Sequence, residues 1–526
     1  MSDIKAIPFA DCALGIEFGS TRIKLVLADA DCRPVASGDC TWASRFENGV
    51  WTYPLDEVWS CLRTAYAALA ADCEARFGGR PSSFGAVGVS GMMHGYLPFG
   101  ADGELLVPFR TWQNTCTGEA SARLTEALSF NIPQRWSAAH LYQAILNGET
   151  HVRNISFLTT LAGYVHWRLT GRKCVGIGEA SGMFPVSGGD YNEDMLERFG
   201  GLIAGQRLPW KPWDILPPVL PAGAGAGSLT PEGARLLDPT GALEPGVPFC
   251  PPEGDAGTGM TATNAVLPRT GNVSAGTSVF SMVVLERPLK SVHPELDVVA
   301  TPDGHDVAMV HCNNCTSDLN AWAGVLREAA SLFGAEPETG ELFTRLYEKS
   351  LEGSADCGGL VAYNLLAGEP VLGLSAGRPM LLREPGSRFT LANLMRAQLY
   401  SAFAALKLGM DRLSDENVKI DSLTGHGGMF KTPGVAQRYL AAAVNSPVSV
   451  LETAGEGGPF GMALLARYML DAAPGETLGA YLENRVFRNC ARTTLSPDPA
   501  DAAGFRAFLT AYQKYLPSEK TAAETN

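Results

Sequence analysis

Two short glycine-containing turns carry the residues best suited to binding an anion. A glycine turn exposes consecutive backbone N–H groups that bind anions, and Ser and Thr hydroxyls add further donors. Each turn alone is equally typical of an ordinary hairpin. The matched pair favours two turns that hold one polyphosphate, as a nucleotide carries. Their residues are Gly19, Ser20 and Thr21 in the first turn and Gly276, Thr277 and Ser278 in the second.

Strand and helix patterns alternate along most of the chain and must position these turns. Each turn joins two apolar runs, so each is expected to close a β-hairpin. Residues 84–89 (FGAVGV) and 307–310 (VAMV) also read as buried strands. From the N-cap candidate Thr390, apolar residues recur every three or four positions, which predicts an amphipathic helix. Such alternation predicts an α/β fold. The apolar positions of that helix are Met395, Leu399, Phe403, Leu406, Met410 and Leu413.

Three further segments are expected to lie outside the regular elements. The Pro/Gly-rich residues 216–230 read as an ordered surface loop, and residues 266–271 (VLPRTG) as a domain boundary. The polar tail beyond Pro517 is expected to be frayed.

Composition limits the class of function. The chain has 526 residues, 46% of them apolar, which is enough for a large core and at least two domains. A formal charge of −14 argues against a nucleic-acid surface. No apolar run approaches the roughly 18 residues of a membrane helix, and the charged N-terminus has no signal-peptide apolar region. We therefore expect neither nucleic-acid nor membrane partners.

The cysteines and the absence of two nucleotide-binding motifs further restrict the class of protein that this chain can be. Twelve cysteines in a chain of this size indicate a reduced, cytoplasmic setting. Cys312 and Cys315 form a single C-x-x-C pair, which we interpret as two structural thiols rather than a zinc or redox site. The chain has no G-x-x-x-x-G-K-[ST] motif, and its glycine-rich runs at 176–182 and 455–461 lack dinucleotide-motif spacing. This argues against P-loop kinases and Rossmann dehydrogenases.

A series of segments resembles the FGGY family of carbohydrate kinases, in family order from about residue 14 to residue 466. Any one match is weak, whereas their order along the chain is specific. The Met-His-Gly turn of the second segment is similar to the xylulokinase branch. The segments are GIEFGSTRIKLVL (15–27), GVSGMMHGYLPFGADGELLVPFRTWQN (88–114), LAGYVHWRLTGRKCVGIGEASGMF (161–184), PEGDAGTGMTATNAV (252–266), GNVSAGTS (271–278), YNLLAGEP (363–370), FTLANLMRAQLYSAFAALKLGMDRL (389–413), GHGGMFKTPGVAQRYLAAAVNSPV (425–448) and EGGPFGMALLA (456–466).

The resemblance implies a fold and an activity. The fold is a pair of actin-like, ribonuclease-H-like lobes, here residues 1–268 and 269–526, with ATP and the sugar in a cleft between them. The activity is transfer of the γ-phosphoryl group of ATP to a sugar hydroxyl, assisted by Mg²⁺. Closure of the lobes over the sugar would exclude water. Members of the family are often homodimers, although nothing in this sequence locates an interface.

Two acidic residues match the reactive positions of the family. Asp255, in the turn Gly254-Asp-Ala-Gly257, matches the aspartate that accepts the hydroxyl proton and also lies near the metal. A turn-forming aspartate is the alternative. Glu17 stands where the family usually has an aspartate that helps to hold Mg²⁺, often through water. Its extra methylene shifts the ion or its water shell, and a solvated acid at a strand end is the alternative.

The remaining residues that are predicted to bind the nucleotide follow from the same resemblance. Gly427 and Gly428 match the glycines against which the adenosine lies, with Phe430 and Thr432 nearby. Phe430 suits a core position equally well, and Lys24 suits an ordinary salt bridge. The predicted nucleotide-binding residues are Gly19, Ser20, Thr21, Lys24, Gly276, Thr277, Gly427, Gly428, Phe430 and Thr432.

For the sugar, Met93 and His94 match the substrate-contacting pair of the xylulokinase branch, at a turn after a buried strand. Trp112 is expected to cover an apolar face of the sugar, and Asn114 to form hydrogen bonds with it. Residues 113–116 (QNTC) depart from the Asn-Asp-Gly-Arg common in xylulokinases. Ala256 replaces the usual asparagine after the catalytic aspartate. Both departures remove polar groups from the predicted sugar site.

The leading hypothesis is an ATP-dependent, xylulokinase-like ketose kinase, with D-xylulose as the first candidate substrate. Within the family, the alternative is another substrate, such as L-xylulose, ribulose, fuculose, rhamnulose or a polyol. From a different class, Glu17 and Ala256 suggest a catalytically weak sensor of sugar and nucleotide. A heat-shock-type or actin-like ATPase shares the phosphate turns but gives no reason for the turn at Met93 and His94.

Overall fold

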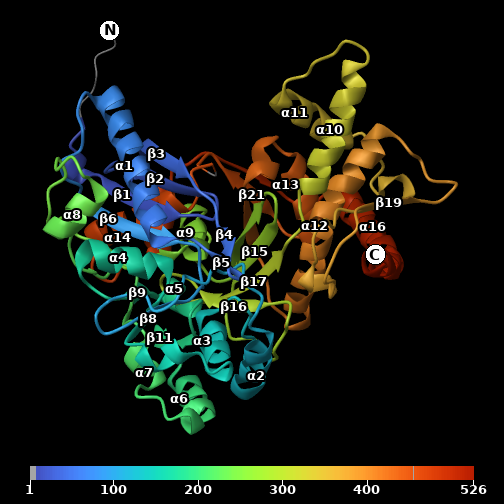
Figure 1. Cartoon of the computed structure of the whole chain (residues 1–526). Helices are drawn as coiled ribbons and strands as arrows, with labels where there is room; N and C mark the ends of the chain where they lie inside the picture. The colour runs from blue at the N-terminus through green and yellow to red at the C-terminus, as the bar shows by residue number, and fades with distance from the viewer. Residues whose placement is uncertain (1–6, 454, 526) are drawn as a thin grey trace. The chain divides into compact units, whose positions relative to one another are not determined.

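The computed structural model describes residues 7–453 and 455–525, and the chain divides into two compact units, each described by itself (Figure 1). Unit 1 comprises the chain up to Val266 together with Val298–Val307 and Glu456–Asn489. Unit 2 comprises Leu267–Asp297, Ala308–Gly455 and the chain from Cys490 onward. The sequence predicted one boundary after residue 268. The observed division differs because the helix α14 (Gly458–Asp471) packs within unit 1.

A mixed sheet forms the centre of unit 1, with strand order β13-β6-β1-β2-β3. Strands β1 and β2 are antiparallel and pair from Ala13 opposite Ala28 to Phe18 opposite Ile23, so the first predicted phosphate turn closes this hairpin. Strand β6 is parallel to both β1 and β13. The strands are β1 (Ala13–Phe18), β2 (Arg22–Ala28), β3 (Pro34–Thr41), β6 (Ala86–Gly91) and β13 (Glu253–Gly254).

Two helices cover opposite faces of this sheet. Successive strand residues point to opposite faces, and two glycines mark where each helix lies. A Cβ on Gly15 of β1 would lie 1.9 Å from Pro459 O in α14. A Cβ on Gly38 of β3 would lie 2.2 Å from Leu69 N in α1 (Leu55–Phe77). Gly38 is opposite Leu25 of β2, which is opposite Ile16 rather than Gly15, so α1 and α14 lie on different faces.

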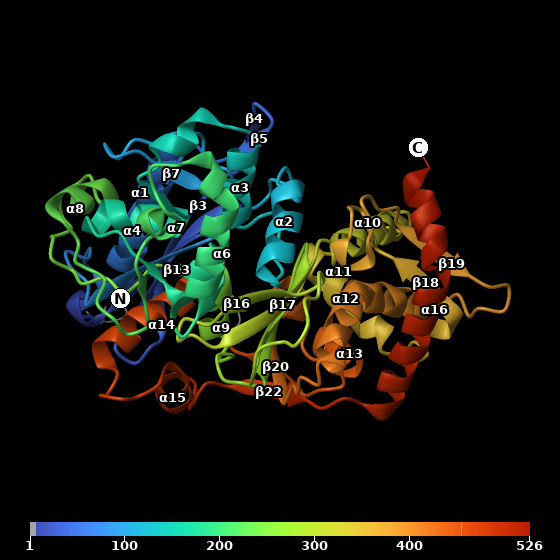
Figure 2. The same ribbon diagram turned by 90° about the horizontal axis from the view of Figure 1, so that it is seen from below.

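The other elements of unit 1 are short strands and helices around this centre (Figure 2). The short strands are β4 (Arg45–Glu47), β5 (Val50–Thr52), β7 (Leu97–Phe99), β8 (Phe157–Thr159), β9 (Val175–Gly176), β10 (Val186–Ser187), β11 (Asp190–Tyr191) and β12 (Val219–Leu220). The helices are α2 (Gly118–Leu128), α3 (Ser137–Leu146), α4 (Leu161–Thr170), α5 (Ile177–Ser181), α6 (Glu193–Ile203), α7 (Pro212–Ile215), α8 (Pro231–Leu237), α9 (Asp255–Ala262) and α15 (Leu478–Tyr481).

The central sheet of unit 2 repeats the arrangement of a hairpin beside a parallel strand. Strands β14 and β15 are antiparallel, and their hairpin contains the second predicted phosphate turn. Strand β20 is parallel to β14, as β6 is to β1. The strands, in sheet order, are β17 (Asp306–Cys312), β15 (Val279–Val284), β14 (Thr270–Ala275), β20 (Ser422–His426), β21 (Val448–Leu451) and β22 (Arg492–Leu495). Strand β16 (Asp297–Ala300) lies where the chain passes between the units.

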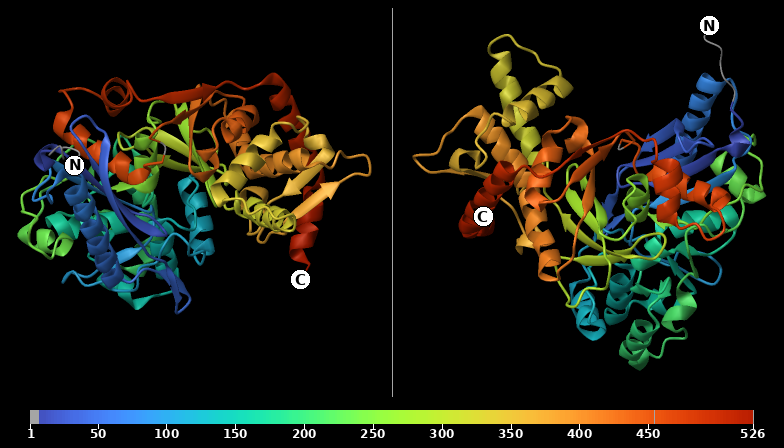
Figure 3. Two further views of the ribbon diagram at one scale, coloured as in Figure 1. Left: turned by 90° about the horizontal axis from the view of Figure 1, so that it is seen from above. Right: turned by 180° about the vertical axis from the view of Figure 1, so that it is seen from behind.

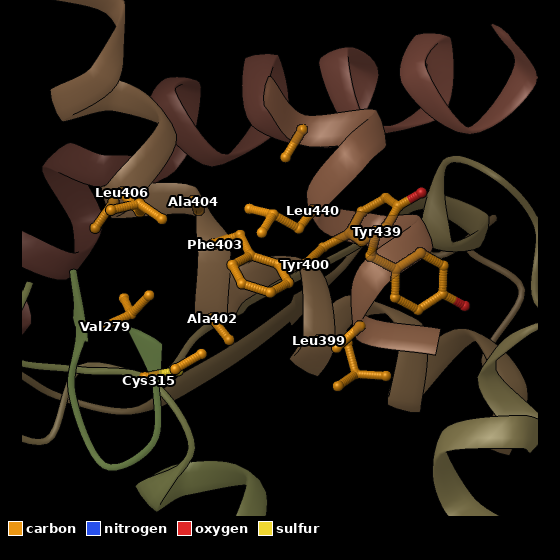
Figure 4. Close-up of a cluster of buried hydrophobic side chains, with 14 of the residues drawn as sticks. Val279, Cys315, Leu399, Tyr400, Ala402, Phe403, Ala404, Leu406, Tyr439 and Leu440 are labelled. Atoms are coloured by element: carbon orange, nitrogen blue, oxygen red, sulfur yellow. The ribbon is translucent and has the colours of Figure 1, made fainter. Parts of the chain in front are cut away.

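Long helices enclose the core of unit 2. The predicted amphipathic helix is confirmed as α12, which spans Leu391–Asp415 and is capped by the Thr390 side chain. Figure 4 shows its residues Leu399 and Phe403 in the core beside Leu440 of the next helix. The helices of unit 2 are α10 (Ser317–Ser331), α11 (Thr339–Ser350), α12 (Leu391–Asp415), α13 (Val435–Val444) and α16 (Pro499–Glu524); a two-stranded sheet pairs β18 (Leu360–Tyr363) with β19 (Met380–Arg383).

The prediction of a frayed tail beyond Pro517 is wrong for the described residues. Helix α16 continues through Pro517 to Glu524 and runs beside the other helices of unit 2 (Figure 3). Glu519 is fully buried and accepts a hydrogen bond from Arg378 N at 2.7 Å. Near the start of the helix, buried Asp501 forms ion pairs with Arg396 and Arg438. These contacts fix both ends of the helix within unit 2.

The remaining segment predictions agree in part. The predicted strands at 84–89 and 307–310 correspond to β6 and β17, with boundaries shifted by up to two residues at either end. The predicted loop at 216–230 is irregular except for β12, which pairs with β9. In the part of the chain that the structure describes, no helix is long and apolar enough to cross a membrane.

Candidate active site

Three parallel strands of unit 1 end at the same edge of the sheet, and predicted site residues lie at or just beyond their ends. Ser90 of β6 pairs with Glu17 of β1 on one side and with Glu253 of β13 on the other. Met93 follows β6, and Asp255 follows β13 directly as the first residue of α9. Open α/β sheets bind ligands at the carboxyl ends of their parallel strands. The fold therefore brings Glu17, Met93 and Asp255 together.

Asp255 is partly exposed at the start of α9 and has a perturbed carboxyl group. Its Oδ1 accepts a hydrogen bond from Met93 N at 3.2 Å. Burial raises the pKa of Asp255 to about 6, and hydrogen bonds from the backbone N–H groups of Met93, Ala256 and Asp255 itself oppose the rise. A carboxylate whose pKa lies near the working pH is suited to accept a proton from an alcohol.

Glu17 lies against the N-terminal end of α14, where a glycine makes room for it. A Cβ on Gly458 would lie 2.0 Å from Glu17 Oε1 and 3.0 Å from Thr258 Oγ1. The longer side chain at position 17 therefore fits because residue 458 has no side chain. Burial raises the pKa of Glu17 to about 8; the negative charge of Asp255 adds to the rise, and the charge of Lys24 opposes it.

The first phosphate turn already uses one of its predicted donors. Gly19 N donates to Arg22 O at 3.0 Å and closes the hairpin, so the Gly19 N–H is not available to a phosphate. Among the described residues, no acceptor takes the N–H of Ser20 or of Thr21. We therefore expect Ser20 and Thr21 to supply the donors, with Gly19 allowing close approach.

Lys24 takes the structural role that the sequence left open. Its Nζ donates to Glu456 O at 3.0 Å and lies 3.6 Å from Glu456 Oε2. This ion pair joins β2 to the segment that precedes α14. A direct role for Lys24 with the nucleotide would require the pair to open.

His94 is held rigidly beside Met93. Its Nδ1 lies 3.0 Å from Gly182 O, and since a carbonyl only accepts, Nδ1 carries the hydrogen of that bond. Its ring stacks on Trp136 at a centroid distance of 5.9 Å. His94 also has a backbone φ of 71°, which is unusual for a residue with a side chain. The turn that holds Met93 and His94 is therefore specifically shaped.

Asn114, which was predicted to form hydrogen bonds with the sugar, has its side chain engaged within the protein. Its side chain is buried and holds backbone groups: Oδ1 accepts from Trp51 N at 2.8 Å, and Nδ2 donates to Trp51 O and Thr111 O, both at 2.9 Å. Both amide hydrogens are thereby used within the protein. The neighbouring Gln113 has a buried Oε1 that no donor among the described residues contacts. Trp112 is half-buried and packs against the core of unit 1.

In unit 2, the second phosphate turn and the predicted adenosine glycines lie together. A Cβ on Gly427, which has φ of 95°, would lie 2.6 Å from Ala275 O, just before the turn. A Cβ on Gly428 or on Gly276 would meet nothing within 4 Å. Gly276 N donates to Ser278 O at 2.9 Å, so its N–H, like that of Gly19, is used within its own hairpin.

Phe430 and Thr432 differ from the two glycines in their exposure. The Phe430 ring packs on Gly425 and belongs to the core of unit 2, with 7% of the residue exposed. Thr432 is 6% exposed. The structure thus gives Phe430 the core role that the sequence left as its alternative. Gly427 and Gly428 remain the open positions.

Two buried acids near Asp255 were not found from the sequence. Glu253 Oε2 accepts from Glu179 N at 2.9 Å. Burial raises the pKa of Glu253 to about 8 and also raises the pKa of Glu179. Glu179 Oε2 would lie 2.8 Å from a Cβ on Gly254, the residue before Asp255. Both lie within segments that resemble the family, but neither was singled out, because the approach of Glu179 to Glu253 depends on the packing of α5 against β13.

Comparison with known proteins identifies the family. Residues 12–260 match the FGGY family of carbohydrate kinases, N-terminal domain, and residues 271–470 match the C-terminal domain of the same family. The chain belongs to the FGGY family of carbohydrate kinases. It is therefore a sugar kinase, a phosphotransferase with an alcohol group as acceptor.

Individual relatives of this FGGY kinase are distant. A xylulose kinase of Haemophilus influenzae is 22% identical over 393 residues, which are 72% of this chain and 75% of that protein. The structure of a xyloylose kinase from Brucella ovis matches with a TM-score of 0.75 and 20% identity over 96% of this chain and 99% of that one. A gluconate kinase from Lactobacillus acidophilus matches with a TM-score of 0.77 and 16% identity over 96% and 98%. These structures share the two-domain, actin-like fold of the family.

Proposed function

We propose that this FGGY kinase transfers the γ-phosphoryl group of ATP to a hydroxyl of a ketose, with xylulose as the first candidate. The observation that carries the proposal is the placement of Asp255, a partly exposed acid beside the Met93 turn at the carboxyl edge of the sheet. The similarity to a xylulose kinase supports the choice of substrate. All twelve cysteines are unpaired, which supports a cytoplasmic setting.

The proposed reaction uses the chain as a base and as a holder of phosphates. Asp255 accepts the proton of the sugar hydroxyl as its oxygen forms a bond to the γ-phosphorus. The bond from that phosphorus to the bridging oxygen of ADP breaks, and ADP leaves with the electron pair. The N–H groups of Ser20 and Thr21 in unit 1, and of Thr277 in unit 2, are the proposed phosphate donors.

Glu17 and Asp255 fit a magnesium ion that arrives with the nucleotide. Their carboxyl groups raise each other's energy when both are charged, as the pKa of Glu17 shows. Among the described residues, no group of three His, Cys, Asp or Glu side chains could hold a metal unaided. Mg²⁺ is commonly held by one or two carboxylates together with substrate phosphates. When bound, the ion would neutralise charge on the phosphates.

Two observations favour a substrate other than xylulose. Asn114 is occupied by the backbone of Trp51 and Thr111, and Ala256 supplies no polar group beside Asp255. Both changes reduce the hydrogen bonds offered to a sugar. A second ketose, such as ribulose, or a polyol is therefore the alternative acceptor within the same chemistry.

A panel of ketoses, polyols and deoxy-ketoses, assayed for ADP formation with Mg²⁺, tests the proposal. We expect one ketose to show a clearly higher kcat/KM than the rest. Asp255→Asn should lower kcat by about 10²–10⁴-fold, because the base is lost, while the Kd for ADP measured by calorimetry without Mg²⁺ changes little.

The panel also separates the kinase from a sensor of sugar and nucleotide. Tight binding of a sugar and ATP with no ADP formed from any acceptor would contradict the proposed activity and support the sensor. Highest kcat/KM for a polyol would keep the chemistry and replace the proposed substrate. An Asp255→Asn protein with wild-type kcat would show that another group accepts the proton.

A further inference from the structure

The carbonyl oxygens of the first phosphate turn are held by two aromatic side chains that no motif marked. Trp42 Nε1 donates to Gly19 O at 2.7 Å, and Tyr53 Oη donates to Ser20 O at 2.7 Å. The rings of Trp42 and Tyr53 stack with centroids 4.3 Å apart. Tyr53 is 1% exposed, so its hydroxyl is fixed in place.

These two hydrogen bonds determine the direction of the N–H groups beside them. In a planar trans peptide, the C=O of one residue and the N–H of the next point in opposite directions. Holding Gly19 O toward Trp42 therefore directs the Ser20 N–H away from Trp42. Holding Ser20 O toward Tyr53 directs the Thr21 N–H away from Tyr53 in the same manner.

A turn that binds an anion needs its peptide N–H groups to be held in one direction. If either peptide rotated by half a turn, a carbonyl oxygen would take the place of an N–H group and repel a phosphate. Glycine permits such rotation more readily than other residues do, because it has no Cβ. The bonds from Trp42 and Tyr53 oppose the rotation, because each would have to break.

The second turn, in unit 2, has the same two carbonyls held by different donors. Gly276 O accepts from Thr316 N at 3.1 Å and from Thr316 Oγ1 at 2.8 Å, and Thr277 O accepts from Cys315 N at 3.0 Å. Gly276 and Thr277 correspond in the hairpin to Gly19 and Ser20. Each turn thus has the carbonyls of its first two residues held by donors, although the first hairpin is one residue longer than the second. Aromatic side chains hold the carbonyls of the first turn, and mainly backbone groups hold those of the second.

The donors of the second turn are themselves anchored by the segment YNLLAGEP. Asn364 Nδ2 donates to Cys315 O at 2.8 Å. Asn314 Oδ1 accepts from Leu366 N and Ala367 N, both at 2.9 Å, and Asn314 Nδ2 lies 3.0 Å from Glu369 Oε2. The Cys315 side chain is buried in the core (Figure 4). This part of the chain thus fixes Cys315 and Thr316 beneath the turn.

We propose that Trp42 and Tyr53 are positioning residues for nucleotide binding, which keep the peptides of the first turn oriented with their N–H groups toward the phosphates. The inference rests on the proposed function, since it takes the turn to bind the phosphates of ATP. The second turn, in which the same two carbonyls are also held by donors, supports it independently of Trp42 and Tyr53. Neither side chain contacts the nucleotide in this proposal.

The variant Tyr53→Phe tests the proposal with a minimal change. It removes the hydroxyl donor to Ser20 O and keeps the ring that stacks on Trp42. We expect the KM for ATP and the Kd for ADP to rise by about fivefold to tenfold, as the loss of one hydrogen bond allows. The KM for the sugar and the melting temperature should change little. Trp42→Phe removes the other donor and should act in the same direction.

Tyr66→Phe is the matched control. Tyr66 is a buried tyrosine of α1 in the same unit, and no hydrogen-bond partner contacts its hydroxyl among the described residues. Its variant should bind ADP as the wild type does. A purely structural role for Tyr53 would instead lower the melting temperature and leave the KM for ATP unchanged.

The outcomes distinguish this inference from the proposed function. If the wild type binds ADP and both Tyr53→Phe and Trp42→Phe bind it within twofold of the wild-type Kd, the positioning role is overturned and the kinase proposal stands. If the wild type neither binds ADP nor forms it from ATP with any acceptor, the proposed function itself is overturned. Should one variant fail to fold, the other decides the question.

Discussion

At the scale of single residues, the site gathers acidic side chains whose charged forms the protein by itself does not compensate. Glu17 and Asp255 both have a raised pKa, mainly because they are buried. The charge of Lys24 opposes the rise in the pKa of Glu17, but Lys24 forms an ion pair with Glu456. A site of this kind is costly to keep in the free protein and favours ligands that bring positive charge or accept hydrogen bonds.

The pKa of Asp255 predicts how the rate depends on pH. The base accepts a proton only when it is ionised, so kcat/KM should fall about tenfold for each pH unit below about 6 and level off above it. A pH profile of kcat/KM with the preferred sugar measures this. A profile that stays flat down to pH 5 would contradict the assignment of Asp255 as the base.

The same pKa gives an independent check through stability. The folded-state pKa of about 6 lies above the ordinary aspartate value of 3.8, so the folded protein binds this proton more tightly than the unfolded chain. The Asp255 contribution to the free energy of unfolding therefore falls as pH rises from about 4 to about 6. In Asp255→Asn this contribution is absent, so the variant should gain stability relative to the wild type above pH 6.

The roles of individual residues could be predicted where they depend on neighbours in the sequence. They could not be predicted where they depend on packing between distant parts of the chain. Asp255 and Met93 follow strands in sequence, so their approach to each other could be expected from the pattern. The use of Asn114 depends on Trp51, a residue 63 positions away. The donors Trp42 and Tyr53 have no spacing that relates them to Gly19. Their roles appear only when the strands are folded.

At the scale of elements, α14 is the piece that aligns the two acids. It packs on β1, which carries Glu17, and on α9, which begins with Asp255. Two glycines allow this close approach. A Cβ on Gly15 would lie 1.9 Å from Pro459 O, and a Cβ on Gly461 would lie 1.9 Å from Thr258 O. Helix α14 can therefore come no closer to either neighbour.

Gly461→Ala tests this role of α14. The added methyl group must push α14 away from α9, and overpacking of this kind costs about 1–3 kcal/mol of stability. We expect a lower melting temperature and a lower kcat, measured by thermal denaturation and by ADP formation. Gly201→Ala is the matched control, since Gly201 is also helical, in α6, and its Cβ would meet nothing within 4 Å. That variant should be as stable as the wild type or slightly more so.

Elements with a strong local signal could be predicted, whereas those that depend on tertiary contacts could not. Helix α12 has both a capping threonine and a regular apolar stripe, and its N-terminal boundary matches the expectation. The last turns of α16 have a polar sequence that contains Pro517 and gave no such signal. They are helical with Glu519 buried against Arg378, a contact distant in sequence.

At the scale of the whole molecule, the chain does not build its two units one after the other. Residues 456–489 return to unit 1, and the chain from Cys490 onward completes unit 2 with β22 and α16. Unit 1 therefore lacks a helix of its central layer until most of the chain has been made. The sequence showed a boundary near residue 268 but had no composition signal for the return.

The path of the chain predicts how fragments behave. A fragment that ends at residue 266 lacks α14, so the apolar face of β1 that contains Gly15 is left uncovered. We expect this fragment to aggregate or to melt without a cooperative transition, as measured by circular dichroism. The same fragment joined by a flexible linker to residues 456–489 should melt cooperatively. Equal cooperativity of the two fragments would show that α14 is dispensable for folding of unit 1.

The contact between Glu17 and Gly458 restricts the order in which mutations can accumulate. While glutamate occupies position 17, even an alanine at position 458 would place its methyl carbon 2.0 Å from a carboxylate oxygen. Shortening the acid to aspartate first would withdraw that oxygen and leave Thr258 Oγ1, at 3.0 Å, as the contact that remains. We therefore expect the two sites to form an epistatic pair, in which a side chain at position 458 is tolerated better after position 17 has been shortened than before.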